Sequence, residues 1–167
     1  EYDWPRFIEM SVGKNKKERI VQASNILKWG MPVALAAQSM NTETLDAIAR
    51  DNISVDAMHD MVEKVHNQEA DTYSDIIVNL PEETKESFEK GLQHIVNARI
   101  NRVFVMTLYL LRGTPMADPE SVEKYGFNVK YRIWPRAFGE YEGERIAEIE
   151  DSVFSTNSIS EEEYMDL

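Results

Sequence analysis

The chain has 167 residues, of which 43% are hydrophobic, so it is long enough to bury the core of one domain. Its 18 basic and 30 acidic residues give a net charge of -12, which argues against a nucleic-acid backbone or an anionic membrane as the main partner. The absence of cysteine excludes disulfides, a thiolate nucleophile and a thiolate-bound zinc or iron–sulfur cluster within these residues.

The apolar period switches repeatedly between two and three to four residues, which is typical of strands that alternate with helices. Strands are predicted at residues 6–12, 33–39, 72–80 and 102–108. Helices are predicted at residues 15–29, from 41 or 42, from 54, and at 84–98. Because a helix precedes each later strand, neighbouring strands should be parallel, with right-handed connections.

The pattern changes in the last third of the chain. A short helix is predicted after Asp118, which precedes a proline, and it should end near Gly126. Two strands that could pair with each other are predicted for NVKYRI and ERIAEIEDSVFS, joined by a loop that contains glycine and acidic residues. Ser160, with Glu163 three residues on, predicts the capped start of a last helix.

Four strands linked by helices make about half of an eight-stranded TIM-type barrel, or the core of an open parallel sheet. We therefore predict an α/β fold with a partial barrel at residues 1–116 and a small α+β extension at residues 117–167. In either architecture, ligands bind at the carboxyl ends of the strands.

Polar side chains occur near the ends of successive strands, and the alternation of side chains along each strand turns them toward one interior. They include Glu9, Gln38 and Asp75. An unpaired buried charge costs several kcal/mol, so two carboxylates and a carboxamide that face one interior predict a polar ligand with ammonium or hydroxyl donors. The alternative is that these groups satisfy one another inside a barrel. His59 and His66 are two helical turns apart, too far for one metal ion, so no metal site is predicted.

Four stretches resemble, in this order and spacing, the later strands of radical S-adenosylmethionine enzymes: IEMSVGKNKKERI, ALAAQSMNTETLDAIARDNIS, SDIIVNLPEETKESFEKGL and INRVFVMTLYLLRGTPM. They are particularly similar to the branch of this family that carries an upstream cobalamin-binding domain. The resemblance runs from about Arg6 to Met116, and WPRAFGEYEG with the acidic strand after it resembles the C-terminal extension of the same branch.

The resemblance implies that several residues bind S-adenosylmethionine. Gln38, with Ser39 beside it, matches a polar position that holds the ribose or the methionyl part. Asp75 matches a position that approaches the ribose hydroxyls, and Glu9 matches an acid that can meet the methionine ammonium. A carboxylate can accept hydrogen bonds from two vicinal hydroxyls, and a carboxamide can both donate and accept, so these residue types suit the implied roles.

The resemblance also implies that the backbone from Leu108 to Leu110 contacts the adenine. This chain departs from the family at three positions, since relatives have glycines where Asn79 and Glu82 occur and a proline where Arg112 occurs. In the family, the three-cysteine loop that binds the four-iron four-sulfur cluster lies upstream, and this chain contains neither that loop nor a cobalamin domain.

By this resemblance, an intact parent enzyme would cleave S-adenosylmethionine to a 5′-deoxyadenosyl radical, or would transfer a methyl group with cobalamin, on an unknown substrate. The chain itself is expected to form the wall of the cofactor site away from the cluster, and to be inactive alone. It reads as a cytoplasmic segment cut from a longer protein, because it has no signal peptide and no apolar run of the ~20 residues that span a membrane.

The expected partners are the missing N-terminal half of the barrel or a second copy of the chain. An alternative hypothesis is a non-catalytic half-barrel that self-associates or binds a partner through its open strand edges. A second alternative, a fragment of a parallel-barrel aldolase or isomerase, is disfavoured for Schiff-base chemistry because no lysine lies at a predicted strand end.

Overall fold

The computed structural model describes residues 7–8, 17–27 and 30–167, which pack into two compact units. Unit 1 comprises the described residues of Glu1–Met40, Asp51–Ile76 and Glu89–Val105, and unit 2 comprises Asn41–Arg50, Ile77–Phe88 and Met106–Leu167. Glu9 and most of the strand predicted at residues 6–12 lie outside the described residues. The predicted domain boundary after residue 116 remains a prediction.

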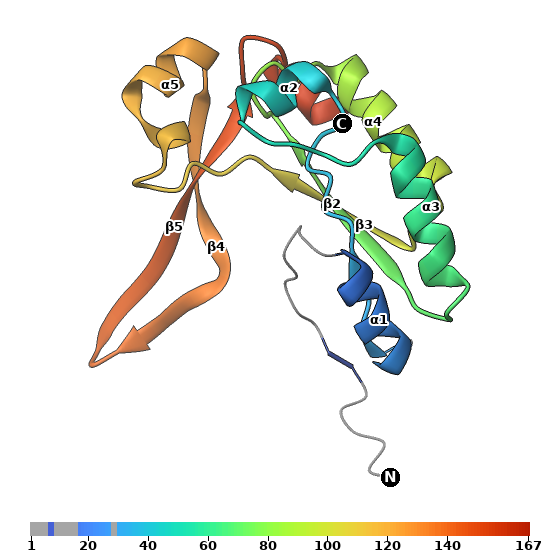
Figure 1. Cartoon of the computed structure of the whole chain (residues 1–167). Coiled ribbons are helices and arrows are strands. Elements are labelled where there is room, and N and C mark those ends of the chain that lie inside the picture. Colours follow the sequence, from blue (N-terminus) through green and yellow to red (C-terminus); the bar gives the residue numbers. More distant parts are fainter. Residues whose placement is uncertain (1–6, 9–16, 28–29) are drawn as a thin grey trace. The chain divides into compact units, whose positions relative to one another are not determined.

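Helices and strands alternate over most of the described chain (Figure 1). The helices are α1 (Lys17–Leu27), α2 (Thr42–Ala47), α3 (Val55–His66), α4 (Lys85–Asn97), α5 (Pro119–Tyr125) and α6 (Glu161–Asp166). The strands are β1 (Val33–Ala34), β2 (Thr72–Val78), β3 (Arg102–Thr107), β4 (Asn128–Tyr141) and β5 (Glu144–Ser155). This order confirms the predicted α/β fold, whereas the half-barrel remains a prediction. Within the described ranges, every helix is too short or too polar to cross a bilayer.

A three-stranded sheet with the order β1-β2-β3 contains the predicted parallel strands. β1 is parallel to β2, and Val33 lies opposite Thr72. Residues of β2 alternate between buried and half-buried, so one face of this strand packs into the core and the other stays accessible. The buried side chains of unit 1 also include three on α3, Met58, Val62 and Val65. Met61, the residue before Val62, is only half-buried.

Two helices begin next to the start positions that the sequence predicts, 41 or 42 and 54, and each has a capping side chain there. The side chain of Asn41 accepts a hydrogen bond from the amide of Glu43 at 3.3 Å, and α2 begins one residue after Asn41. The hydroxyl of Ser54 accepts one from the amide of Ala57 at 3.2 Å, and α3 begins at the next residue. Each cap satisfies an amide that lacks a partner inside the first turn of its helix.

The core of unit 2 is an apolar cluster that connects the end of β2, the segment after β3, α5 and the hairpin β4–β5. Its buried members are Leu80, Leu108, Leu110, Tyr125, Phe127 and Val153. α5 ends at Gly126, whose φ of 62° is the left-handed conformation that ends many helices. Asp118 precedes α5 as predicted, but its side chain forms no capping hydrogen bond.

β4 and β5 form an antiparallel hairpin, which confirms that the two predicted strands pair. The prediction that a loop follows NVKYRI is wrong, because β4 continues to Tyr141, which pairs with Glu144. Only Glu142 and Gly143 form the turn, and their φ values of 53° and 83° match the two-residue turn that suits the twist of a hairpin. An irregularity between Ile133 and Phe138 lets the strand absorb residues that the sequence assigns to a loop.

Candidate functional site

The segment that follows β1 is one residue longer than the part of β2 that it faces. Ala34 lies opposite Tyr73, but the next paired position, Gln38, lies opposite Ile76. The amide of Gln38 donates to the carbonyl oxygen of Asp75 at 2.8 Å. This bulge therefore brings the backbones of two candidate site residues, Gln38 and Asp75, side by side at the carboxyl end of a parallel strand pair.

Gln38 has a positive φ of 62°, which is uncommon for a residue with a side chain. The amide of Ser39 donates to the carbonyl oxygen of Ala37 at 2.8 Å, so the chain makes a three-residue turn centred on Gln38. Turns of this kind with a positive φ at the central residue are strained. Such strain costs of order 1–3 kcal/mol and is concentrated at functional sites, so it directs attention to this strand end.

Two side chains from distant parts of unit 1 hold this turn. The side-chain amide of Asn52 donates to the carbonyl oxygens of Ala37 and Ser39, both at 2.7 Å. The buried hydroxyl of Ser74 donates to the carbonyl oxygen of Leu35 at 3.0 Å and accepts a longer hydrogen bond, 3.3 Å, from the amide of Ala37. The backbone groups that the bulge removes from the ladder thus regain partners.

Neither Asn52 nor Ser74 is among the site residues that the sequence predicts. Asn52 lies between two helices, 15 residues from Ala37, and acts through backbone carbonyls. No hydrophobic period or cap pattern marks such a residue. Its only sequence signal is its place within one of the four stretches that resemble the family.

The accessibility of the candidate side chains follows the predicted alternation. Ala34, Ala36 and Gln38 are half-buried, as are Tyr73 and Asp75 on β2, while the residues between them are buried. Gln38 and Asp75 are therefore accessible enough to meet a ligand and are held by a rigid sheet. Ser39 is 1% exposed, so its side chain belongs to the core of unit 1.

Leu108 and Leu110 belong to unit 2, and their side chains are part of its apolar core. The amide of Leu108 donates to the backbone carbonyl oxygen of Val78 at 3.1 Å, and the amide of Leu110 donates to that of Asp151 at 2.8 Å. The carbonyl oxygen of Leu108 accepts from the amide of Val153 at 2.9 Å. The amides of Leu108 and Leu110 therefore already donate hydrogen bonds. An adenine ring at this position would have to contact other atoms of the backbone, such as the carbonyl oxygens, each of which can accept a second hydrogen bond.

The loop after β2 adopts left-handed backbone where the resemblance implies glycine. Asn79 has a φ of 66° and Glu82 has a φ of 59°. Asn79 is fully buried, and its side-chain amide donates to the carbonyl oxygen of Val153 at 2.7 Å, which compensates for part of the backbone strain. The backbone conformation that glycine favours is thus kept although the side chains differ.

The chain was compared with known proteins. No protein-family model matches it. Over 169 residues it is 28% identical to the 2-(S-pantetheinyl)-carbapenam-3-carboxylate methyltransferase of Streptantibioticus cattleyicolor, and equally to the cobalamin-dependent radical SAM methyltransferase TokK of Streptomyces tokunonensis. Each match covers 97% of this chain but 24% of the relative, so the chain spans about a quarter of the length of these relatives.

A solved structure shares this fold at low sequence identity. The radical S-adenosylmethionine methyltransferase TsrM from Kitasatospora setae matches with a TM-score of 0.51 and 15% identity, over 65% of this chain and 20% of that one. This likeness concerns the fold alone. The two sequence relatives confirm the resemblance to radical S-adenosylmethionine enzymes of the cobalamin-dependent branch.

Proposed function

We propose that the chain forms the wall of an S-adenosylmethionine site in a radical S-adenosylmethionine methyltransferase, on the side away from the iron–sulfur cluster. The observation that carries the proposal is the strained end of β1, where Gln38 lies beside Asp75 on the accessible face of a parallel strand pair. The sequence relatives support it, since both are methyltransferases and one is a cobalamin-dependent radical SAM enzyme by name.

The residue types suit the parts of the cofactor. The Asp75 carboxylate would accept hydrogen bonds from the two ribose hydroxyls, and the Gln38 carboxamide would donate to or accept from the ribose or the methionyl group. Glu9 is proposed for the methionyl ammonium, and the backbone from Leu108 to Leu110 for the adenine. When bound, S-adenosylmethionine supplies either a methyl group or a 5′-deoxyadenosyl group.

The chain has no cysteine, so it offers no thiolate to the four-iron cluster. We therefore assign it no step of reductive cleavage. In a larger protein that also holds the cluster, its part would be to bind and orient the cofactor. Generation of the 5′-deoxyadenosyl radical, or cobalamin-assisted methyl transfer, would belong to that larger protein.

The test is a titration of the ¹⁵N-labelled chain with S-adenosylmethionine, followed by NMR. We expect saturable shifts at the amides of Gln38 and Asp75. Asp75→Ala should weaken binding by roughly tenfold to a hundredfold, because a charged acceptor for the ribose hydroxyls is lost. Asp60→Ala, which changes an exposed carboxylate on α3, is the matched control and should leave the affinity unchanged.

A second titration tests whether Asp75 binds the ribose hydroxyls. Methylthioadenosine should bind the unmodified chain more tightly than its 2′-deoxy analogue, and Asp75→Ala should remove that difference. Equal affinity of the Asp75→Ala and unmodified chains for S-adenosylmethionine, or shifts confined to residues away from Gln38 and Asp75, would refute the assignment.

A non-catalytic half-barrel that self-associates is the second candidate. The observation that favours it is β3, an edge strand of the three-stranded sheet on which Phe104 and Val105 are 44% and 52% exposed. Exposed apolar side chains on a sheet edge invite another chain. This candidate predicts association without saturable S-adenosylmethionine binding, so the titration above separates the two.

A further inference from the structure

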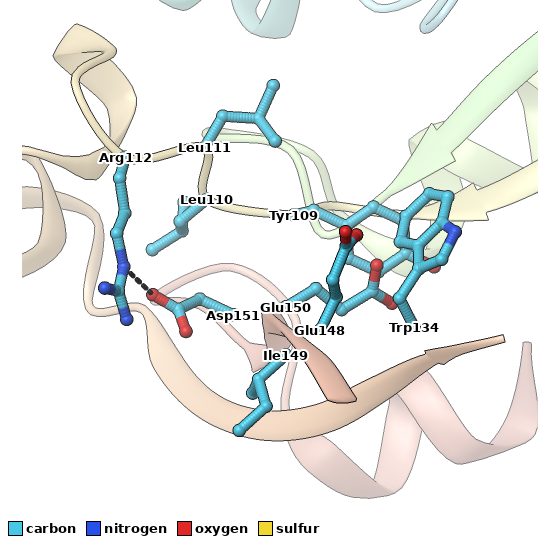
Figure 2. A pocket seen from close by; sticks show the side chains of 9 residues that line it. All are labelled: Tyr109, Leu110, Leu111, Arg112, Trp134, Glu148, Ile149, Glu150 and Asp151. Carbon is cyan, nitrogen blue, oxygen red and sulfur yellow. Dashed lines mark ion pairs between the residues drawn. The ribbon is translucent and has the colours of Figure 1, made fainter. Parts of the chain in front are cut away.

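Unit 2 contains a cavity of about 230 Å³ beside the hairpin β4–β5, but the acidic side chains that line it do not meet (Figure 2). Glu150 pairs with Arg132 on one face of β5, whereas Asp151, the next residue along the strand, points to the other face, toward Arg112. Each of these carboxylates already has a partner, and the two do not form one site. The end of β1 in unit 1 differs, because side chains from separate segments converge there on a single turn.

Asn52 spans the turn at Gln38 with a single side-chain nitrogen. Its Nδ2 lies 2.7 Å from the carbonyl oxygen of Ala37 and 2.7 Å from that of Ser39, the residues on either side of Gln38. A carboxamide nitrogen carries two hydrogens, so both can be donated to this turn. The side chain of Asn52 therefore holds the backbone before and after Gln38.

The strained backbone of this turn needs such support. Gln38 has a φ of 62°, and a residue with a Cβ atom keeps a positive φ only where its surroundings impose it. The hydroxyl of Ser74 holds the residues before Gln38 through Leu35 and Ala37. Loss of the Asn52 side chain would remove a donor from both carbonyl oxygens that flank Gln38, so the backbone could relax toward a negative φ and redirect the Gln38 side chain.

Asp75 is held in a different way. It lies within β2, which is the central strand of the three-stranded sheet and has a neighbour on each side. Among the described residues, the side chain of Asn52 donates to the segment around Gln38 and makes no hydrogen bond to Asp75. A change at Asn52 should therefore move Gln38 and leave Asp75 in place.

We propose that Asn52 is a positioning residue of the S-adenosylmethionine site, which sets the direction of the Gln38 carboxamide and acts on the cofactor only through that side chain. The inference rests on the proposed function, in which Gln38 contacts the ribose or the methionyl group. Gln38 is half-buried on the accessible face of the sheet. A contact from a side chain whose backbone is already fixed loses less freedom on binding, so the affinity should depend on Asn52.

The test is a double-mutant cycle on the 167-residue chain, with the affinity for S-adenosylmethionine measured by NMR titration. Asn52→Ala should weaken binding by roughly tenfold, because the Gln38 carboxamide is no longer held in the binding direction. Gln38→Gly should weaken binding by a similar factor, since it removes the carboxamide while glycine keeps a positive φ without strain. Asn67→Ala, at the exposed end of α3, is the matched control and should bind as the unmodified chain does.

The double variant separates a positioning role from a general loss of structure. In the Gln38→Gly background, Asn52→Ala should change the affinity by less than about twofold, because the side chain through which Asn52 acts is absent. Equal losses in the two backgrounds would mean that Asn52 supports the site by another route, and would overturn the proposal. If Asn52→Ala alone does not fold, Asn52→Ser, which keeps one donor, enters the same cycle with the same expected direction.

The result for Asp75→Ala separates failure of the positioning role from failure of the cofactor site itself. Saturable binding that Asp75→Ala weakens and Asn52→Ala leaves unchanged would overturn the role of Asn52 alone. An unmodified chain that shows no saturable binding of S-adenosylmethionine would refute the cofactor site and the role of Asn52 together.

Discussion

Left-handed backbone at residues other than glycine occurs where β1 and β2 end. Gln38, Asn79 and Glu82 have φ values of 62°, 66° and 59°. The side chain of Asn52 donates hydrogen bonds beside Gln38, and the side chain of Asn79 donates one to Val153, so both compensate for strain. Glu82 is exposed, and its carbonyl oxygen accepts from the side chain of Asn41. The backbone of Glu82 can therefore be tested without removing a side-chain contact of the core.

We expect Glu82→Gly to be more stable than Glu82→Ala by about 0.5–1 kcal/mol, because glycine adopts a positive φ without the steric cost that a Cβ atom adds. Urea unfolding of the two variants measures the difference. The same pair of changes at Glu89, an exposed residue inside α4, should give the opposite sign, since glycine weakens a helix interior by about 1 kcal/mol. A less stable Glu82→Gly would show that this backbone conformation is not kept in solution.

Asn52 is the residue that most directly fixes the turn at Gln38. Asn52→Ala should lower the free energy of unfolding by about 1–3 kcal/mol, because the carbonyl oxygens of Ala37 and Ser39 lose their donor. The amide shift of Gln38 should also change. Asn67→Ala, at the exposed end of α3, is the control with little expected effect on either measurement. An Asn52→Ala chain with unchanged stability and an unchanged Gln38 signal would contradict this role.

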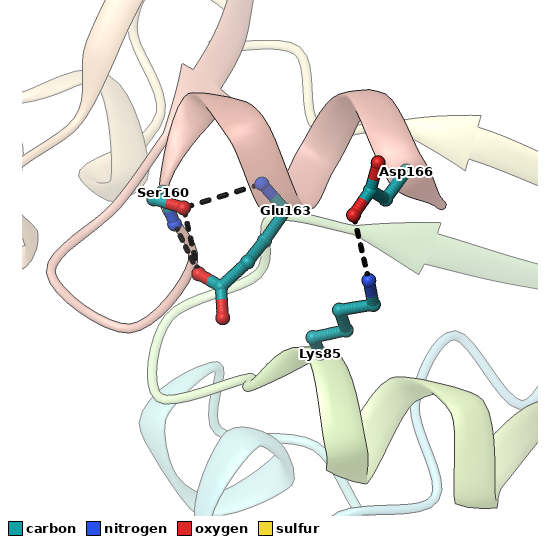
Figure 3. A network of polar contacts seen from close by, with 4 residues as sticks. All are labelled: Lys85, Ser160, Glu163 and Asp166. Atoms are coloured by element: carbon teal, nitrogen blue, oxygen red, sulfur yellow. Dashed lines mark hydrogen bonds and ion pairs between the residues drawn. The ribbon is translucent and has the colours of Figure 1, made fainter.

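At the scale of a single element, α6 shows how a short helix is held by its first turn. Ser160 and Glu163 form a capping box in which the Ser160 hydroxyl accepts from the amide of Glu163 and the Glu163 carboxylate accepts from the amide of Ser160 (Figure 3). The ion pair between Lys85 and Asp166, at 3.1 Å, ties the other end of the helix to α4 within unit 2. A helix of six residues depends on such contacts, because it is too short to be stable alone.

The capping box makes α6 sensitive to acid. Hydrogen bonds from the backbone and then the side chain of Ser160 hold the pKa of Glu163 below its ordinary value of 4.5. A lowered pKa in the folded state contributes stability above the ordinary value, and this stability is lost as the pH falls through the folded value. We therefore expect α6 to unfold locally below about pH 4.5 before the rest of unit 2, as measured by hydrogen exchange of its amides.

Ser160→Ala should raise the pKa of Glu163 toward its ordinary value, as measured by an NMR titration of the carboxyl carbon, because both contacts of the hydroxyl are removed. Asp166→Asn removes the ion pair with Lys85 but keeps the capping box, so the low pKa should persist. A pKa of Glu163 that Ser160→Ala leaves unchanged would show that the hydroxyl has no part in lowering it.

At the scale of the whole molecule, exposed apolar side chains are the feature that bears on self-association of the chain. In unit 1 they include Phe104 and Val105 on the edge strand β3, and in unit 2 they include several side chains of the hairpin β4–β5. The hairpin members that are more than half exposed include Tyr131, Ile133, Phe138 and Ile149. Large exposed apolar patches on a protein mark interaction surfaces or aggregation sites.

We expect the chain alone to show concentration-dependent sedimentation, and Val105→Lys to shift it toward the monomer, because a lysine on an edge strand opposes pairing with another edge. Val96→Lys is a matched control, since Val96 on α4 is 55% exposed and Val105 is 52% exposed, but Val96 is not on a strand. A chain that sediments as a monomer at every concentration would count against the half-barrel that self-associates.

Local patterns in the sequence were sufficient for most of the fold. The caps Asn41, Ser54 and Ser160, and the alternation of buried and accessible residues along β2, depend on interactions within a few residues or on the period of one element, and the structure confirms them. The accessible faces that carry Gln38 and Asp75 follow from the same alternation.

Only the tertiary structure decided how the strand ends are shaped. The turn at Gln38 depends on Asn52, whose hydrogen bonds span 13 and 15 residues, and on Ser74, whose hydroxyl reaches across 39 residues to Leu35. The length of β4 and the cavity beside it arise from the pairing of two strands around a two-residue turn. Such features depend on groups that meet only after the chain has folded, and no local period of the sequence encodes them.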